Sequence, residues 1–107
     1  MALPTVSRHS MLLAVEQFKR GVRSDQGPKP GADWLGDGRH HYVLVADDGE
    51  PYPVKEIIRL AVRIETGTWP PRFWGGPLDA NRYAERLGFA VERKDAWLDA
   101  HRQRGAD

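Results

Sequence analysis

The stretch VKEIIRLAVRIE, residues 54–65, decides the fold of this 107-residue chain. Its apolar residues recur at the spacing of one face of an α-helix, and its basic residues fall on the opposite side. We therefore expect an amphipathic helix from Val54 to Glu65 that ends at Gly67. The apolar face comprises Ile57, Leu60, Ala61 and Ile64, and the basic face comprises Lys55, Arg59 and Arg63.

Three further helices follow from the same periodicity and from the residues at their ends. Ser7 to Arg20 has a serine suited to the N-cap and apolar residues at helical spacing. Leu78 to Leu87 is closed by Gly88, and Asp95 to Arg102 forms a final amphipathic segment. We expect the long stretch between residues 24 and 38, rich in Gly, Pro and Asp, to be a loop.

Short β-strands are predicted between the helices. His41 to Ala46 is rich in β-preferring residues, and Asp47-Asp48-Gly49 has the composition of a tight turn. Glu50 to Pro53 would return as a second strand, and Phe89 to Val91 would form a third. The elements together predict an α+β fold, with a small antiparallel sheet packed against about four helices.

The composition is that of one globular domain. Hydrophobic residues make up 40% and charged residues 29%, which suits a folded chain with one core. We expect a single domain over residues 1–107, with its core at 7–93 and a C-terminal helix at 95–104. The absence of cysteine excludes disulfides and thiolate metal sites. No signal-peptide pattern and no membrane-length apolar run occur, so we expect a cytoplasmic protein.

No catalytic constellation is evident. His40 and His41 are adjacent on an expected strand, where side chains point to opposite faces, so they are poorly placed to chelate one ion. Asp47-Asp48-Gly49-Glu50 fits a turn better than an acidic metal pair. The chain contains no G-x-S-x-G, Walker A or H-E-x-x-H motif. We expect no enzymatic activity, no metal and no cofactor.

The features that suggest binding gather between residues 52 and 86. They are a basic helix face, an aromatic loop that ends in two glycines, and polar residues on the next helix. Basic side chains beside aromatic residues and a helix N-terminus suit nucleic acid. The net charge is only +1, so the expectation rests on this cluster and not on bulk charge. The candidate DNA-binding residues are Lys55, Arg59, Trp69, Arg72, Phe73, Trp74, Gly75, Gly76, Asn81 and Arg82.

A family resemblance narrows the expected ligand. Five stretches carry it: Tyr52 to Ala61 (YPVKEIIRLA), Thr66-Gly67, Phe73-Trp74-Gly75-Gly76, Ala80-Asn81-Arg82 and Leu87-Gly88-Phe89-Ala90-Val91. In this order they resemble the N-terminal modified-DNA recognition domain of bacterial HNH-type restriction endonucleases directed at 5-methylcytosine. The resemblance extends over residues 7–93, and it departs at Trp74, where the family commonly has Ser. It implies a reader of methylated double-stranded DNA, here free-standing because no HNH motif is present.

We expect the methyl group to be read in the major groove of an intact duplex, without base flipping, since the sequence shows no deep pocket. The methyl would meet an aromatic side chain, an arginine would read guanine, and cations with backbone N–H groups would hold phosphates. The assigned residues are Trp69, Phe73 or Trp74 for the methyl, Arg72 or Arg82 for guanine, and Lys55, Arg59 and Gly75-Gly76 for phosphates.

Other interpretations stay open. The aromatic and arginine residues would also suit a protein-interaction module of a restriction or regulatory complex. A further alternative is a reader of a different mark, such as hydroxymethylcytosine or a phosphorothioate backbone. A reduced nuclease is disfavoured by the lack of a metal-binding cluster. We expect association with the nucleoid, and weak homodimerisation through the C-terminal helix is left open.

Overall fold

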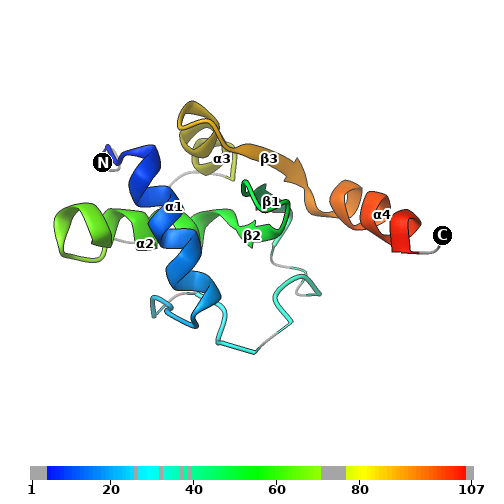
Figure 1. Ribbon diagram of the computed structural model, residues 1–107, viewed down its shortest axis with the longest axis horizontal. Coiled ribbons are helices and arrows are strands. Elements are labelled where there is room, and N and C mark those ends of the chain that lie inside the picture. Colours follow the sequence, from blue (N-terminus) through cyan, green and yellow to red (C-terminus); the bar gives the residue numbers. More distant parts are fainter. Residues whose placement is uncertain are drawn as a thin grey trace.

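The computed structural model describes residues 5–25, 27–31, 33–36, 38, 40–70 and 77–105, with backbone alone at 77, 78 and 102–105. Within these ranges the chain forms four helices and three strands (Figure 1). In chain order they are α1 (Arg8–Lys19), β1 (Tyr42–Val45), β2 (Pro51–Pro53), α2 (Val54–Thr66), α3 (Pro77–Arg86), β3 (Ala90–Arg93) and α4 (Lys94–Gly105).

The three strands form an antiparallel sheet with β1 in the centre. The strand order is β2-β1-β3, and Leu44 of β1 is paired with Tyr52 on one side and Val91 on the other. At the hairpin between β1 and β2, Gly49 has a φ of +78°, which a residue with a side chain rarely adopts. This sheet with its helices confirms the predicted α+β class.

Helix α2 supplies the centre of the core. Its predicted apolar face is buried at Ile57, Leu60 and Ala61, each with no measurable exposure, while Ile64 is only partly buried. Ile58 is also fully buried, so the buried face is broader than the predicted stripe. The helix ends at Gly67, whose φ of +79° allows its N–H to donate to the Arg63 carbonyl at 2.8 Å.

Helix α1 packs across α2 and covers it with an apolar face (Figure 1). Ser7 is the N-cap as predicted, because its hydroxyl accepts the Ser10 N–H at 3.1 Å. Glu65, near the end of α2, accepts hydrogen bonds from Ser7 N–H at 2.9 Å and Ser10 Oγ at 2.8 Å, and these bonds lower the pKa of its carboxyl. The buried residues that α1 contributes are Ser10, Met11, Ala14, Val15 and Phe18.

Tyr52, Asp48 and Lys19 form a polar cluster that connects the β1–β2 hairpin to α1. Tyr52, which is 5% exposed, donates from its hydroxyl to Asp48 at 2.6 Å, and its ring meets Phe18 edge-on at 5.8 Å. Lys19 lies 3.6 Å from the Asp48 carboxylate. The hairpin is therefore tied to α1 by an aromatic contact and a charge pair.

The C-terminal part differs slightly from the prediction. β3 comprises Ala90–Arg93 in place of Phe89–Val91, and α4 begins at Lys94 and continues to Gly105. Figure 1 shows α4 extending away from the other helices. Within it, Trp97 is buried and stacks on His101 with 3.7 Å between ring centroids. None of the helices in the described part of the chain is long and apolar enough to cross a membrane.

Candidate functional site

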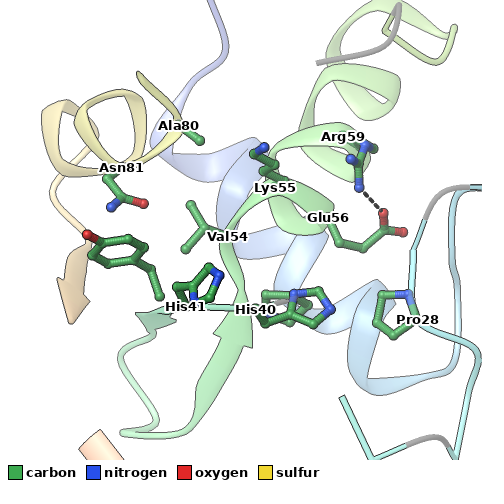
Figure 2. A pocket seen from close by; sticks show the side chains of 11 residues that line it. Pro28, His40, His41, Val54, Lys55, Glu56, Arg59, Ala80 and Asn81 are labelled. Carbon is green, nitrogen blue, oxygen red and sulfur yellow. Dashed lines mark hydrogen bonds and ion pairs between the residues drawn. The ribbon is translucent and has the colours of Figure 1, made fainter. Parts of the chain in front are cut away.

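A pocket with a volume of about 230 Å³ opens where the first turn of α2 meets the N-terminal half of α3 (Figure 2). The segment 40–42 before β1 and a proline from the loop after α1 complete its wall. Its polar lining residues are His40, His41, Lys55, Glu56, Arg59 and Asn81, and its other lining residues are Pro28, Tyr42, Pro53, Val54 and Ala80.

Three of the predicted DNA-binding residues come together at this pocket. Lys55 and Arg59 reach it from successive turns of α2, and Asn81 reaches it from α3. Arg82 lies next to Asn81 in sequence but is exposed, and it is not among the pocket residues. The fold therefore joins the two polar segments that the sequence places 22 residues apart, from Arg59 to Asn81.

Asn81 is the most informative of these side chains. It is only 6% exposed, and Figure 2 shows its carboxamide directed into the pocket. Its carboxamide makes no hydrogen bond to another described residue. Buried polar groups are normally hydrogen-bonded, so this amide is suited to a partner that enters the pocket.

Arg59 differs from its expected place on a solvated basic face. Its side chain is 13% exposed, and its guanidinium lies 3.0 Å from the carboxylate of Glu56, whose side chain is 1% exposed (Figure 2). The three residues of the basic face therefore differ in exposure and in the groups that they contact. Lys55 is half-buried, Arg59 is enclosed beside a carboxylate, and Arg63 is exposed and lies over the ring of Trp69 at 4.5 Å.

Glu56 is the residue that sequence reasoning missed. Its carboxylate accepts hydrogen bonds from the N–H and the Oγ of Ser24, each at 2.6 Å, in addition to the contact with Arg59. Gly27 packs so closely on this carboxylate that an added Cβ would collide with it. The only signal in the sequence was an acidic residue in the first turn of a helix, which is ordinarily a solvated, dipole-compensating position.

Arg23 also holds the loop after α1, which carries Ser24, Gly27 and Pro28, in place. Its guanidinium donates to the carbonyls of Phe18 and Pro28, both at 2.7 Å, and its Cζ lies 3.5 Å from the centre of the Phe18 ring. Burial lowers the pKa of Arg23, and the Glu56 carboxylate acts in the opposite direction. These bonds hold the loop that carries Pro28 against the pocket.

The two histidines line the pocket together, although their expected alternation made them poor partners for one metal ion. His40 is half-buried and meets Trp34 edge-on at 5.5 Å, whereas His41 is exposed. No group of three or more His, Asp or Glu side chains suited to a metal occurs within the described ranges. Two imidazoles, a lysine, an amide and the Arg59–Glu56 pair line the cavity together with its apolar residues.

Of the aromatic loop, residues 69–76, the structure describes only Trp69 and Pro70. Trp69 is half-buried and packs on the core, with Arg63 over its ring. Five other predicted site residues lie outside the described residues, namely Arg72, Phe73, Trp74, Gly75 and Gly76.

Comparison of the chain with protein-family models, with curated proteins and with solved structures finds no match.

Proposed function

We propose that the protein is a non-catalytic reader of double-stranded DNA that carries 5-methylcytosine. The observation that supports this most directly is the convergence of Lys55, Arg59 and Asn81 on one pocket. The sequence predicts a nucleic-acid contact at each of these three residues. Their convergence from two helices favours a binding surface over an ordinary solvated helix face.

The charged groups suit the backbone of a duplex. Lys55 at the pocket and the exposed Arg82 of α3 would contact phosphates, where lysine and arginine position a protein without reading sequence. Arg59 would contribute less net charge, since Glu56 lies 3.0 Å from it. Binding would therefore depend on a few local phosphate contacts, in keeping with a net charge of only +1.

The apolar lining suits a methyl mark. Val54, Pro53 and Ala80 present aliphatic carbon beside the amide of Asn81. Burial of one methyl group contributes about 1 kcal/mol, which corresponds to roughly a fivefold preference for each mark. A symmetric site with two marks would multiply that preference.

Direct binding measurements test the proposal. Duplexes that differ only at one CpG site, with cytosine, 5-methylcytosine or 5-hydroxymethylcytosine, are titrated at low salt, and a phosphorothioate duplex is added as a competitor. We expect measurable affinity for all duplexes and the tightest binding to 5-methylcytosine. An absence of binding to every duplex would refute DNA recognition, and equal binding would refute methyl reading.

Two further measurements address the rest of the proposal. A supercoiled plasmid incubated with the protein and Mg²⁺ or Mn²⁺ should stay intact, because the protein is proposed to bind without cleaving. A reader of this kind would be associated with the nucleoid, so a fluorescent fusion should follow the DNA in cells. Plasmid cleavage would contradict the non-catalytic role.

A further inference from the structure

The size of the pocket matches a single heterocyclic base. Its volume is about 230 Å³, compared with roughly 30 Å³ for each water molecule in the liquid. That space is large enough for one pyrimidine ring. The expectation that an intact duplex is read depended on the apparent lack of such a pocket.

The amide of Asn81 indicates the kind of ligand. A carboxamide offers a donor and an acceptor side by side, which is the pattern that a nucleobase edge complements. A bare phosphate would pair only with the Nδ2 donor and would leave the Oδ1 acceptor unused. Asn81 is only 6% exposed, so a ligand in the pocket that pairs with both amide atoms would bind better than one that pairs with a single atom.

The charges in the pocket favour the same ligand. The Glu56 carboxylate, 1% exposed, lines the pocket and lies beside Arg59, so the interior is not an open cationic site. A buried carboxylate disfavours an isolated anion nearby. A neutral base would enter without this repulsion, while Lys55 on the first turn of α2 would meet the phosphate that flanks it.

We propose that this pocket receives one pyrimidine base turned out of the DNA duplex, with the base edge hydrogen-bonded to Asn81 and the ring enclosed by the apolar wall. The inference rests on the proposed function, since it assigns the base-binding site of the same DNA reader. Base extrusion costs the energy of unstacking and unpairing, and that cost is smallest where the target base is already mispaired. A mispaired target therefore separates this mechanism from reading of an intact duplex.

The first experiment uses the unmodified protein and needs no variant. Duplexes carry one 5-methylcytosine, paired with guanine or opposite adenine, and 2-aminopurine replaces the neighbouring base as a reporter of unstacking. We expect 2-aminopurine fluorescence to rise severalfold on binding to the paired duplex. We also expect about tenfold tighter binding when the target is mispaired. Unchanged fluorescence together with equal or weaker binding to the mispaired duplex would overturn the inference.

The second experiment removes the hydrogen-bonding edge. Asn81→Leu keeps the approximate size of the side chain without its polar atoms, and Asn81→Asp replaces the donor with an acceptor. Both should bind methylated duplex about tenfold more weakly and lose the advantage of the mispaired target. Glu85→Gln is the matched control, because Glu85 is exposed on the same helix and does not line the pocket. An Asn81→Leu protein that folds and keeps the mispair advantage would overturn the inference.

The outcomes distinguish this inference from the proposed function. If the unmodified protein binds no duplex, DNA recognition itself is wrong. If it binds and prefers 5-methylcytosine, but shows neither the fluorescence rise nor the mispair advantage, the protein reads the mark in an intact duplex and the pocket assignment fails.

Discussion

The Glu56 carboxylate accepts two hydrogen bonds from Ser24, one from its N–H and one from its Oγ, each at 2.6 Å, although the residues are 32 positions apart. Arg59 adds a third contact at 3.0 Å. A single buried acid thereby connects the loop after α1 to the first turn of α2. The loop wall and the α2 wall of the pocket meet at this carboxylate.

Replacing Glu56 should destabilise the fold markedly. Glu56→Ala leaves Arg59 and the Ser24 donors enclosed without their acceptor, and breaking a buried ion pair from one side costs about 3 kcal/mol. Urea denaturation followed by circular dichroism measures this loss. Glu16→Ala is the control, because that carboxylate is 55% exposed and its 3.6 Å pair with Lys19 should contribute less than about 1 kcal/mol. Equal losses for the two variants would contradict the anchoring role of Glu56.

The packing of Gly27 on the same carboxylate gives a separate prediction. A Cβ at Gly27 would collide with the Glu56 side chain, so Gly27→Ala should lower the free energy of unfolding by about 1–3 kcal/mol. Gly38→Ala is the matched control, because a Cβ there would meet nothing within 4 Å. We expect that control to be neutral or slightly stabilising. Thermal unfolding of both variants in one buffer decides the comparison, and a stable Gly27→Ala would contradict it.

The sequence allowed the elements to be predicted better than their contacts. Hydrophobic periodicity and the glycine at its end placed α2 to within one residue, since Val54 to Glu65 was expected and Val54–Thr66 is observed. Ser7 was recognised as an N-cap because its hydroxyl acts on a neighbour three residues away. Such local rules need no knowledge of the tertiary structure.

Contacts between distant segments were out of reach for the same reason. The pairing of β1 with β3 and the bond between Ser24 and Glu56 join residues that no periodicity relates. Arg59 was expected on a solvated face, because helical spacing alone assigns it there. The loop after α1 instead packs on Glu56, next to Arg59, and its Pro28 lines the same pocket as Arg59.

The basic residues of the proposed DNA-binding surface differ in exposure, so their replacement should change the salt dependence of DNA affinity to different extents. Each phosphate contact lowers log affinity as log salt concentration rises, with a slope of about 0.9 for each contact. Lys55→Ala and Arg82→Ala should each reduce the slope for duplex binding by about one contact. Arg59→Ala should reduce it less, since Arg59 is 13% exposed and lies beside Glu56. Titrations at several salt concentrations measure the slopes, and three equal reductions would show that Arg59 acts as a full phosphate contact.

The hydrogen bond from Tyr52 to Asp48 predicts how stability changes at high pH. Burial, and then the Asp48 carboxylate, raise the pKa of Tyr52 far above its ordinary value of 10.0. A folded-state pKa above the unfolded one contributes stability that is fully present below pH 10 and is lost as the pH rises beyond it. The unfolded chain then releases the Tyr52 proton while the folded protein retains it. We therefore expect the free energy of unfolding to fall above about pH 10.

Tyr52→Phe isolates this contribution. The variant keeps the edge-on ring contact with Phe18 but lacks the hydroxyl, so it should lose about 1 kcal/mol at neutral pH. The free energy of unfolding of this variant should also decline less steeply above pH 10 than that of the unmodified protein.

At acid pH the hydrogen bond between Tyr52 and Asp48 affects stability through the Asp48 carboxyl. Burial works to raise the pKa of that carboxyl, but the bonds from Tyr52 and the Glu50 N–H, with the charge of Lys19, hold it below its usual value. That part of the stability is present at neutral pH and is lost as the pH falls through the lowered pKa. Urea denaturation at a series of pH values measures the loss of stability at acid and at alkaline pH. Identical pH profiles for the unmodified protein and Tyr52→Phe would show that this bond does not couple stability to pH.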